Sequence, residues 1–283
     1  MSVPPISARP GANRPVQMMP IEGPFLPMTD TVRDPQTFVR SFSRGLEVII
    51  ALGTKDGSMS LSEVAEAAKL SPSVTRRLLS TLCELGYVKQ ENRAFSLSPK
   101  VIDLGSAYLE SHSWSKLLQP KLTMATERLQ MTTAAGVLDG SEVVHIVRSP
   151  APDLMHFNFN IGQRFPAFVT AQGRVLLASL DEESLKDFFA RYERPAFTEK
   201  TKTSEAELRK ELELARKQGY SIVDQELQIG LVSIAVPVKS RSGRTAAALN
   251  VTTYELGSGI RRARDKVLNV LNAVASDISQ FIP

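Results

Sequence analysis

One segment, Ser71–Leu85, constrains the possible folds of this chain most strongly. Ser71-Pro72 is a helix-start signal, since serine caps helix N-termini and proline in the first turn gives up no hydrogen bond. Gly86 suits the left-handed residue that ends a helix. At helical spacing, an apolar side (Val74, Leu78, Leu82 and Leu85) lies opposite a polar side (Ser73, Arg76, Arg77 and Ser80). The segment therefore predicts a helix that packs on one side and presents arginine and serine on the other.

The neighbouring segments predict a winged helix-turn-helix over residues 38–98. A helix is expected from Phe38 to Ala51, and a second one, capped by Ser60 or Ser62, follows a turn. After Gly86, two short strands flank a polar turn at Glu91–Arg93. Residues 1–37 hold 8 of the 17 prolines and show no periodicity, so they are expected to form a disordered tail.

The polar side of the Ser71–Leu85 helix is typical of a surface that enters the major groove of double-stranded DNA. Arginine can hold guanine through two hydrogen bonds, and serine can bind phosphates or base edges. Residues 38–100 carry 9 basic against 6 acidic side chains, while the whole chain has a net charge of +4. The alternative is an ordinary solvated helix surface, and for Arg93 an ordinary solvated turn. The predicted DNA contacts are Ser71, Ser73, Thr75, Arg76, Arg77, Ser80 and Arg93.

The remainder of the chain predicts an α+β domain with an antiparallel sheet. Residues 99–116 read as a linking helix, and residues 117–283 as the larger domain. Asp139-Gly140 predicts a hairpin turn, Phe157 to Ile161 a half-buried strand, and Val232–Val238 with Ala246–Thr253 a strand pair. Expected helices include Thr170–Leu180, one capped by Asp181, one from a capping box at Ser204 to Gly219, and a closing helix from Ile260 to Phe281.

Several motifs, taken in order, resemble the IclR family of bacterial transcription regulators. The motif "SLSEVAEAAKLSPSVTRRLLSTLCELGYV" is similar to its DNA-binding half. The later runs "GQRFPAFVTAQGRVLLASL", "GYSIVDQELQIGLVSIAVPV" and "GRTAAALNVTTY" are similar to its effector-binding domain. "FVRSFSRGLEVI" further resembles the branch that controls protocatechuate and p-hydroxybenzoate catabolism. The resemblance implies a GAF-like sensor domain, a homodimer or homotetramer, and a small effector such as an aromatic carboxylate.

The resemblance also implies an effector pocket, at positions that match the family's lining residues. These are Ala171, Gln172, Gly173, Asp224, Glu226, Ser233, Asn250 and Thr252. The strand pattern partly agrees, because Ser233 alternates with apolar neighbours and Asn250 shares a strand face with Thr252. The alternative for these three is a solvent-facing position on a strand.

A carboxylate effector would need a cation or free N–H groups. Arg148, Arg164 and Arg174 are candidates, although Arg174 is expected to pair with Asp224 or Glu226 instead. The start of the helix near Ala171–Gly173 is a further source of N–H groups. His145 alternates with Val144 and Ile146, which predicts a polar residue on a strand face.

Enzyme and metal signatures are missing from the sequence. It contains no GxSxG elbow, HExxH, phosphate loop or GxGxxG after a strand, so no catalytic residue, cofactor or metal ligand is predicted. A single cysteine, Cys83, fits a reducing cytoplasm, and no apolar run is long enough to span a bilayer. The competing hypotheses are a small-molecule hydrolase with an N-terminal interaction module, in which Ser233 lacks an evident histidine partner, and a scaffold that binds other proteins.

Overall fold

The computed structural model describes residues 37–111, 114–151, 160–254 and 262–282. The chain divides into two compact units, Met1–Ser43 and Arg44–Pro283. The predicted tail, residues 1–37, lies outside the described residues except for Thr37, and so do most of the predicted strand at Phe157–Ile161 and the start of the predicted closing helix at Ile260.

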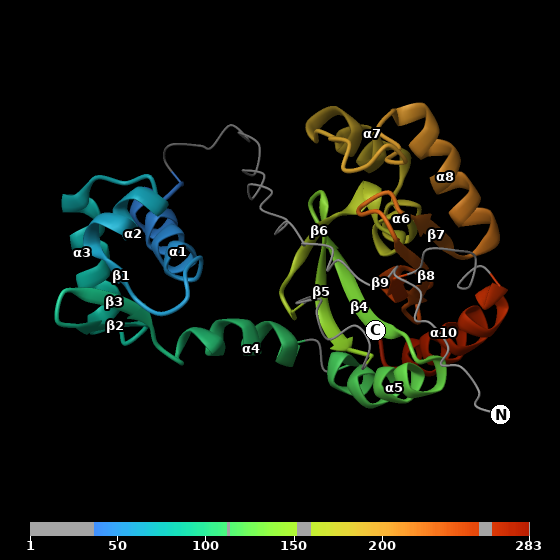
Figure 1. The fold of residues 1–283 in the computed structure, drawn as a ribbon, viewed down its shortest axis with the longest axis horizontal. Helices are drawn as coiled ribbons and strands as arrows, with labels where there is room; N and C mark the ends of the chain where they lie inside the picture. The colour runs from blue at the N-terminus through green and yellow to red at the C-terminus, as the bar shows by residue number, and fades with distance from the viewer. Residues whose placement is uncertain (1–36, 112–113, 152–159, 255–261, 283) are drawn as a thin grey trace, which may run out of the picture. The chain divides into compact units, whose positions relative to one another are not determined.

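The N-terminal region has the predicted order of a winged helix-turn-helix (Figure 1). Its elements are α1 (Arg40–Leu52), β1 (Met59–Ser60), α2 (Leu61–Ala67), α3 (Pro72–Glu84), β2 (Val88–Glu91) and β3 (Ala94–Leu97). Ser60 caps α2, and a full capping box with Glu63 fixes its start. Strand β1 was not predicted; it pairs with β3, so the wing is a three-stranded sheet in the order β1-β3-β2.

Helix α3 packs through a side that differs from the predicted one. It buries Thr75, Leu79 and Leu82 in a core that also holds Val48, Val64 and Phe95. Leu85, predicted to belong to the apolar side, is 53% exposed, because α3 ends at Glu84 and Leu85 is its C-cap. The packed side is therefore rotated by about one residue, while Ser73, Arg76, Arg77 and Ser80 remain exposed.

The C-terminal region is an α+β domain on one antiparallel sheet. The linking helix is α4 (Val101–Ser111). The domain contains α5 (Trp114–Leu129), β4 (Thr132–Asp139), β5 (Glu142–Ser149), β6 (Arg164–Pro166), the 3₁₀ turn η2 (Ala167–Val169), α6 (Ala171–Leu177), α7 (Glu182–Arg191), α8 (Glu205–Gln218), β7 (Ser221–Asp224), β8 (Leu231–Lys239), β9 (Thr245–Tyr254) and α10 (Arg264–Ser279). The six strands lie in the order β6-β5-β4-β9-β8-β7.

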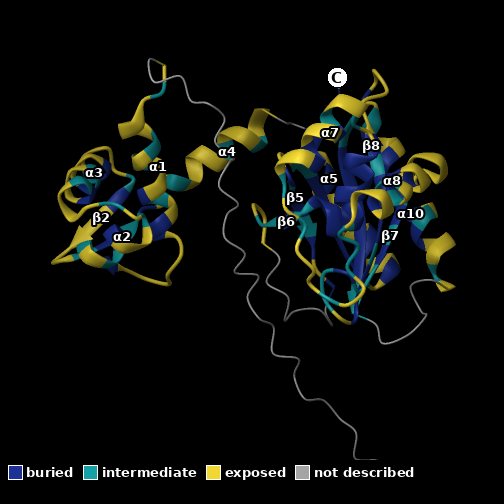
Figure 2. Ribbon diagram, turned by 90° about the horizontal axis from the view of Figure 1, so that it is seen from above, coloured by how far each residue is buried: buried dark blue, intermediate teal, exposed yellow. Residues whose placement is uncertain are grey.

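Helices cover both faces of this sheet, and each face has its own apolar core. Helices α5 and α10 pack on one face, around Leu122, Ile234 and Leu271. Helix α6, with α7 and α8 beyond it, packs on the other, around Val143, Leu176 and Phe188. Figure 2 shows the buried residues concentrated in the sheet and on the inner sides of these helices.

The predicted helix ends are confirmed at several positions. Asp181 caps α7 through the Ser184 N–H, and Ser204 caps α8 through the Glu207 N–H. Gly219 ends α8 with φ of 78°, a left-handed conformation that favours glycine. Along the described ranges, no helix combines the length and the apolar character needed to cross a lipid bilayer.

Strand β5 carries one extra residue relative to β4. Ala135 pairs with Val147 and Gly136 pairs with His145, so Ile146 has no partner on β4. A β-bulge of this kind re-aims the side chains beyond it, because the alternation of faces is interrupted. Ile146 and Val147 consequently both belong to the core beneath α5 and α10.

Candidate functional site

Two surfaces bring predicted site residues together, and the first is the outer side of α3. Ser73, Arg76, Arg77 and Ser80 are all exposed there. Ser71 occupies the N-cap position, where its hydroxyl lies 3.3 Å from that of Ser73. Arg93 is exposed in the tight turn between β2 and β3, directly after Asn92, whose φ is 56°. Guanidinium and hydroxyl groups therefore lie along one helix side and at one hairpin tip.

Thr75 does not share this surface. Its side chain is fully buried, and its hydroxyl donates to the Ser71 carbonyl at 3.0 Å. That hydrogen bond to the preceding turn satisfies the polar atom and lets threonine pack among apolar neighbours. The prediction that Thr75 contacts DNA is wrong for this reason.

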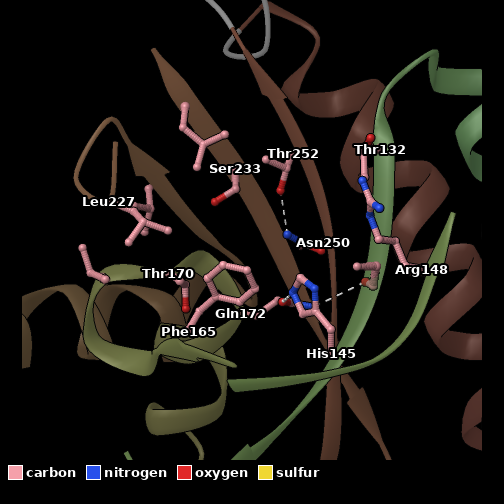
Figure 3. A pocket seen from close by; sticks show the side chains of 14 residues that line it. Thr132, His145, Arg148, Phe165, Thr170, Gln172, Leu227, Ser233, Asn250 and Thr252 are labelled. Carbon is pink, nitrogen blue, oxygen red and sulfur yellow. Dashed lines mark hydrogen bonds between the residues drawn. The ribbon is translucent and has the colours of Figure 1, made fainter. Parts of the chain in front are cut away.

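The second surface is a cavity between the sheet and α6 (Figure 3). The empty space between its walls is about 540 Å³, a volume that includes open solvent. Its walls combine apolar side chains with a small number of polar ones. The lining residues are Thr132, Ala134, His145, Arg148, Phe165, Val169, Thr170, Gln172, Val223, Leu227, Leu231, Ser233, Asn250 and Thr252.

The register of four strands builds the floor of this cavity. Ser233 on β8 pairs with Thr252 on β9, which pairs with Thr132 on β4. In the neighbouring row, Asn250 pairs with Ala134, which pairs with Arg148 on β5. Directly paired residues point to the same face of a sheet, so these side chains all face α6.

The bulge at Ile146 places His145 and Arg148 on the cavity face together. Residues three apart on a regular strand point to opposite faces, but the extra residue between these two restores a common side. Both side chains line the cavity, His145 only 6% exposed and Arg148 half-buried. The prediction that His145 is a polar residue on a strand face is confirmed, but its place beside Arg148 in the cavity was not predicted, because alternation carries no sign of a bulge.

His145 is held by Gln172, which reaches it from α6. Their side chains meet at 2.9 Å between His145 Nε2 and Gln172 Oε1. Gln172 Nε2 donates to the carbonyl oxygens of Ala134 and Ala248 at 3.3 and 3.0 Å. The Phe165 ring lies beside the imidazole, with 4.9 Å between ring centroids. Burial, together with the nearby charge of Arg148, lowers the pKa of His145 to about 4 against the opposing hydrogen bond of Gln172.

Two glycines allow α6 to approach the sheet this closely. A Cβ on Gly136 would lie 2.5 Å from Val143 Cγ1 and 3.2 Å from Gln172 Oε1. A Cβ on Gly173 would lie 2.1 Å from the Ala167 carbonyl oxygen. Neither position has room for a side chain, so both glycines contribute to the placement of Gln172.

Half of the predicted effector residues line the cavity. Gln172, Ser233, Asn250 and Thr252 do so. Ala171 and Gly173 are buried within α6 and are not among the lining side chains, and the Gly173 N–H donates to Thr170 Oγ1 rather than to a site.

Asp224 and Glu226 lie elsewhere, so their predicted contact with the effector is corrected. Both line a separate hollow beside α8 that also includes Lys202 and Glu211. Glu226 is engaged by Arg174 at 2.8 and 2.6 Å and by the Lys202 backbone N–H at 3.0 Å. Burial raises the pKa of Glu226, but the hydrogen bonds and charges of Arg174 and Lys202 outweigh it and the net pKa is lowered.

The three candidate arginines have three different environments. Arg174 is fully buried and forms the ion pair with Glu226 that the sequence predicted. Arg164 pairs with Asp139 and Glu142 and lines a different hollow. Arg148 alone among them lines the sheet cavity, and burial lowers its pKa. Among the residues that the structure describes, no group of three or more His, Cys, Asp or Glu side chains is arranged to hold a metal ion.

Family models match both regions just described. Residues 41–92 match the IclR helix-turn-helix domain, and residues 106–280 match the C-terminal domain of the bacterial transcriptional regulator IclR. The chain belongs to the IclR family of bacterial transcriptional regulators. The expected fold class, an N-terminal winged helix-turn-helix followed by an α+β effector domain, is confirmed by this membership.

Individual IclR-family proteins are similar over most of the chain. The Pca regulon regulatory protein of Pseudomonas putida is 34% identical over 85% of this chain and 83% of its own. The p-hydroxybenzoate hydroxylase transcriptional activator of Acinetobacter baylyi is 30% identical over 87% of this chain and 93% of its own. These relatives are regulators rather than enzymes, so the hydrolase hypothesis has no support.

Solved structures of the family agree with the fold. A putative transcriptional regulator from Rhodococcus sp. RHA1 superposes with a TM-score of 0.75 and is 35% identical in sequence. The match covers 86% of this chain and 98% of the Rhodococcus chain. The inducer-binding domain of PobR from Acinetobacter, a double mutant in complex with 3-hydroxybenzoic acid, has a TM-score of 0.55 and 30% identity. It covers 59% of this chain and 98% of its own.

Proposed function

We propose that this IclR-family regulator controls an operon for aromatic-acid catabolism, and that it binds a small aromatic carboxylate in the sheet cavity. The observation that carries this proposal is the make-up of the cavity, whose lining combines the Arg148 guanidinium with apolar side chains that include Phe165 and Leu227. An aromatic ring fits such walls, and a guanidinium is the preferred partner of a carboxylate. The names of the Pca and p-hydroxybenzoate regulators and the 3-hydroxybenzoic acid complex of PobR support the same ligand class.

The DNA contacts in this proposal come from α3 and the wing. Arg76 and Arg77 are exposed on α3 and would reach base edges in the major groove of a double-stranded operator. Ser71, Ser73 and Ser80 would bind phosphates or base edges, and Arg93 the backbone or minor groove. Exposure of all six side chains supports this assignment.

The effector contacts in this proposal are cavity residues only. Gln172, Ser233, Asn250 and Thr252 are retained, and His145 and Arg148 are added. Arg148 would bind the carboxylate, and the threonine, serine and asparagine side chains of the floor would orient the rest of the ligand.

The organisation proposed for the chain is a DNA-binding domain at 38–98, a linker at 99–116 and an effector domain at 117–283, after the N-terminal tail at 1–37. We propose a homodimer or homotetramer, because paired recognition helices bind half-sites roughly 34–36 Å apart. Leu46 and Ile50 on α1 and, separately, Ile102 and Leu104 on α4 are exposed apolar side chains that would suit subunit contacts. A regulator that binds operator DNA would act in the bacterial cytoplasm.

A gel-shift assay with added effectors tests the proposal. The probe is the DNA upstream of the operon next to this gene, with protocatechuate, p-hydroxybenzoate or β-ketoadipate added in turn. A true effector changes operator affinity, since a ligand shifts a conformational equilibrium only through different affinities for the two states. It also raises the melting temperature of the protein by mass action. If specific operator binding is absent, or no aromatic acid alters either readout, the proposal is rejected.

A further inference from the structure

The hydrogen-bonding pattern of Gln172 determines which atoms of its amide donate and accept. Its Nε2 lies within hydrogen-bond distance of two backbone carbonyl oxygens, those of Ala134 and Ala248. A carbonyl oxygen accepts hydrogen bonds and never donates them, so the atom facing both must be the NH₂ group. Gln172 Oε1, an acceptor only, is therefore the atom that faces His145 Nε2 at 2.9 Å.

This arrangement fixes the tautomer of His145. Because Gln172 Oε1 can only accept, His145 Nε2 must carry the hydrogen. A neutral imidazole has one N–H, so Nδ1 is left as a lone pair that accepts hydrogen bonds. Burial and the adjacent Arg148 charge both oppose a second proton on the ring.

His145 Nδ1 is buried and has no hydrogen-bond partner among the described residues. Asn250 Oδ1 is also buried without a hydrogen-bond partner among these residues. The amide nitrogen of the same side chain donates to Thr252 Oγ1 at 2.8 Å. A buried polar atom without a hydrogen-bond partner costs free energy. Acceptor atoms of this kind in a cavity wall therefore favour a ligand that donates hydrogen bonds to them. Both residues line the cavity, His145 from β5 and Asn250 from β9 on either side of β4, and Arg148 lines it from β5 as well (Figure 3).

We propose that His145 Nδ1 accepts a hydrogen bond from a hydroxyl group of the effector, which makes His145 a specificity residue for hydroxylated aromatic acids. The inference rests on the proposed function, and it adds a requirement that a carboxylate site alone does not impose. Arg148 attracts the carboxylate of benzoate and of hydroxybenzoates alike. Only a hydroxylated ring can also donate to the His145 lone pair.

The test compares 3-hydroxybenzoate, 4-hydroxybenzoate and benzoate by titration calorimetry on the full-length protein. We expect at least one hydroxybenzoate to bind roughly 10- to 100-fold more tightly than benzoate, because benzoate leaves the buried acceptor unpaired. The matching fluorobenzoate, which fills similar space without a donor, should bind as weakly as benzoate. Equal affinity for hydroxybenzoates and benzoate would overturn the inference but would leave an aromatic-carboxylate sensor intact.

Two substitutions of His145 distinguish the role of Nε2 from the role of Nδ1. His145→Gln can still donate to Gln172 from the end of its side chain but lacks an acceptor at the Nδ1 position, so the ratio of hydroxybenzoate affinity to benzoate affinity should fall to near unity. His145→Asn keeps an oxygen near the Nδ1 position and should keep part of the preference. A full preference for the hydroxybenzoate in His145→Gln would refute the proposal.

Long-range ¹H–¹⁵N NMR spectra of the free protein give a readout that needs no ligand. The proposal requires His145 to be neutral with its hydrogen on Nε2, and requires the Nδ1 resonance to move on addition of the tighter hydroxybenzoate and not of benzoate. A hydrogen on Nδ1 in the free protein would overturn it. If neither benzoate nor hydroxybenzoate binds the wild type, the proposed function fails together with this inference, which is distinct from binding without preference.

Discussion

Arg174 and Glu226 form a two-pronged ion pair in the interior of the effector domain, with 2.8 Å from Nη1 to Oε1 and 2.6 Å from Nη2 to Oε2. The pair joins α6, which carries Gln172, to the segment after β7, which carries Leu227. Arg174 Nε also donates to the Phe168 carbonyl, at 3.0 Å. One buried contact thus ties together the elements that form two walls of the cavity.

Glu226→Gln should lower the stability of the effector domain. The substitution removes the nearer carboxylate partner of the buried Arg174 and leaves only Glu211, at 3.6 Å. Loss of one partner of a buried ion pair costs about 3–5 kcal/mol. Chemical denaturation followed by circular dichroism measures the difference. The control is Glu213→Gln, which removes an exposed ion pair with Lys217 on α8 and should leave the denaturation midpoint unchanged. Equal midpoints for wild type and Glu226→Gln would contradict the stabilising role of the pair.

The stability of the protein should fall as the pH decreases from 6.5 towards 4. The pKa of folded His145 is about 4 against an ordinary value of 6.5, so the unfolded chain binds the additional proton in this window. Protons bound to the unfolded state favour unfolding, by up to about 3 kcal/mol for this shift. His145→Gln should flatten the dependence of unfolding free energy on pH between these values. Parallel curves for the two proteins would contradict the prediction.

Arg76→Ala and Arg77→Ala should each weaken operator binding without affecting effector binding. Loss of a base-contacting arginine costs roughly 1–3 kcal/mol, and loss of a phosphate contact reduces the salt dependence of the affinity. Gel shifts at several salt concentrations distinguish the two roles. Arg191→Ala, at an exposed arginine of α7, is the matched control and should bind operator normally. Unchanged affinity in both α3 variants would exclude this helix as the recognition element.

Gly136→Ala should weaken effector binding by displacing Gln172. Its Cβ would lie 2.5 Å from Val143 Cγ1, so β4 or β5 must shift, and Gln172 Oε1 at 3.2 Å must move with them. Calorimetric titration with hydroxybenzoate measures the loss, which should exceed tenfold if the His145–Gln172 contact breaks. Gly105→Ala in α4, where nothing lies within 4 Å of the new atom, should instead keep the affinity and slightly favour the helix. Similar affinities for the two alanine variants would show that the close approach at Gly136 is unimportant.

Arg148→Met should reduce affinity for aromatic carboxylates by roughly 10- to 100-fold, because the carboxylate would lose its charged partner in an apolar cavity. Methionine keeps much of the side-chain volume. Arg164→Met is the comparison, since that arginine pairs with Asp139 and Glu142 and does not line the cavity. Both variants are titrated with the same acid, and a larger loss in Arg164→Met than in Arg148→Met would refute the assignment.

Sequence reasoning predicted the helices and long strands well because their signals are local. Caps such as Asp181 and Ser204 and the left-handed Gly219 act within one turn, and the β8 and β9 patterns extend over many residues. The short strands β1, β6 and β7 were not predicted, because two to four residues carry no measurable periodicity. Strands β2 and β3 are as short, but the polar turn between them indicated a hairpin.

The errors in the predicted sites have physical causes as well. Thr75 is polar by type, yet a hydrogen bond to Ser71 lets it pack in the core. Glu226 was assigned to the pocket because its position in the sequence matches a lining residue of the family. In the structure, its carboxylate instead accepts hydrogen bonds from Arg174 and Lys202. His145 does lie on a strand face as predicted, but its shared side with Arg148 depends on the unpaired Ile146, which alternation does not reveal.

In the proposed effector site, the unpaired Ile146 would also determine the direction in which an asymmetric ligand binds. His145 and Arg148 lie on the same side of β5, so the hydrogen-bond acceptor of His145 always precedes the positive charge of Arg148 along the strand. Exchanging the two side chains would leave the backbone pairing unchanged and reverse that order. A hydroxy acid would then have to bind in the reverse orientation to contact both groups. The order of His145 and Arg148 along β5 therefore sets the orientation of the bound ligand.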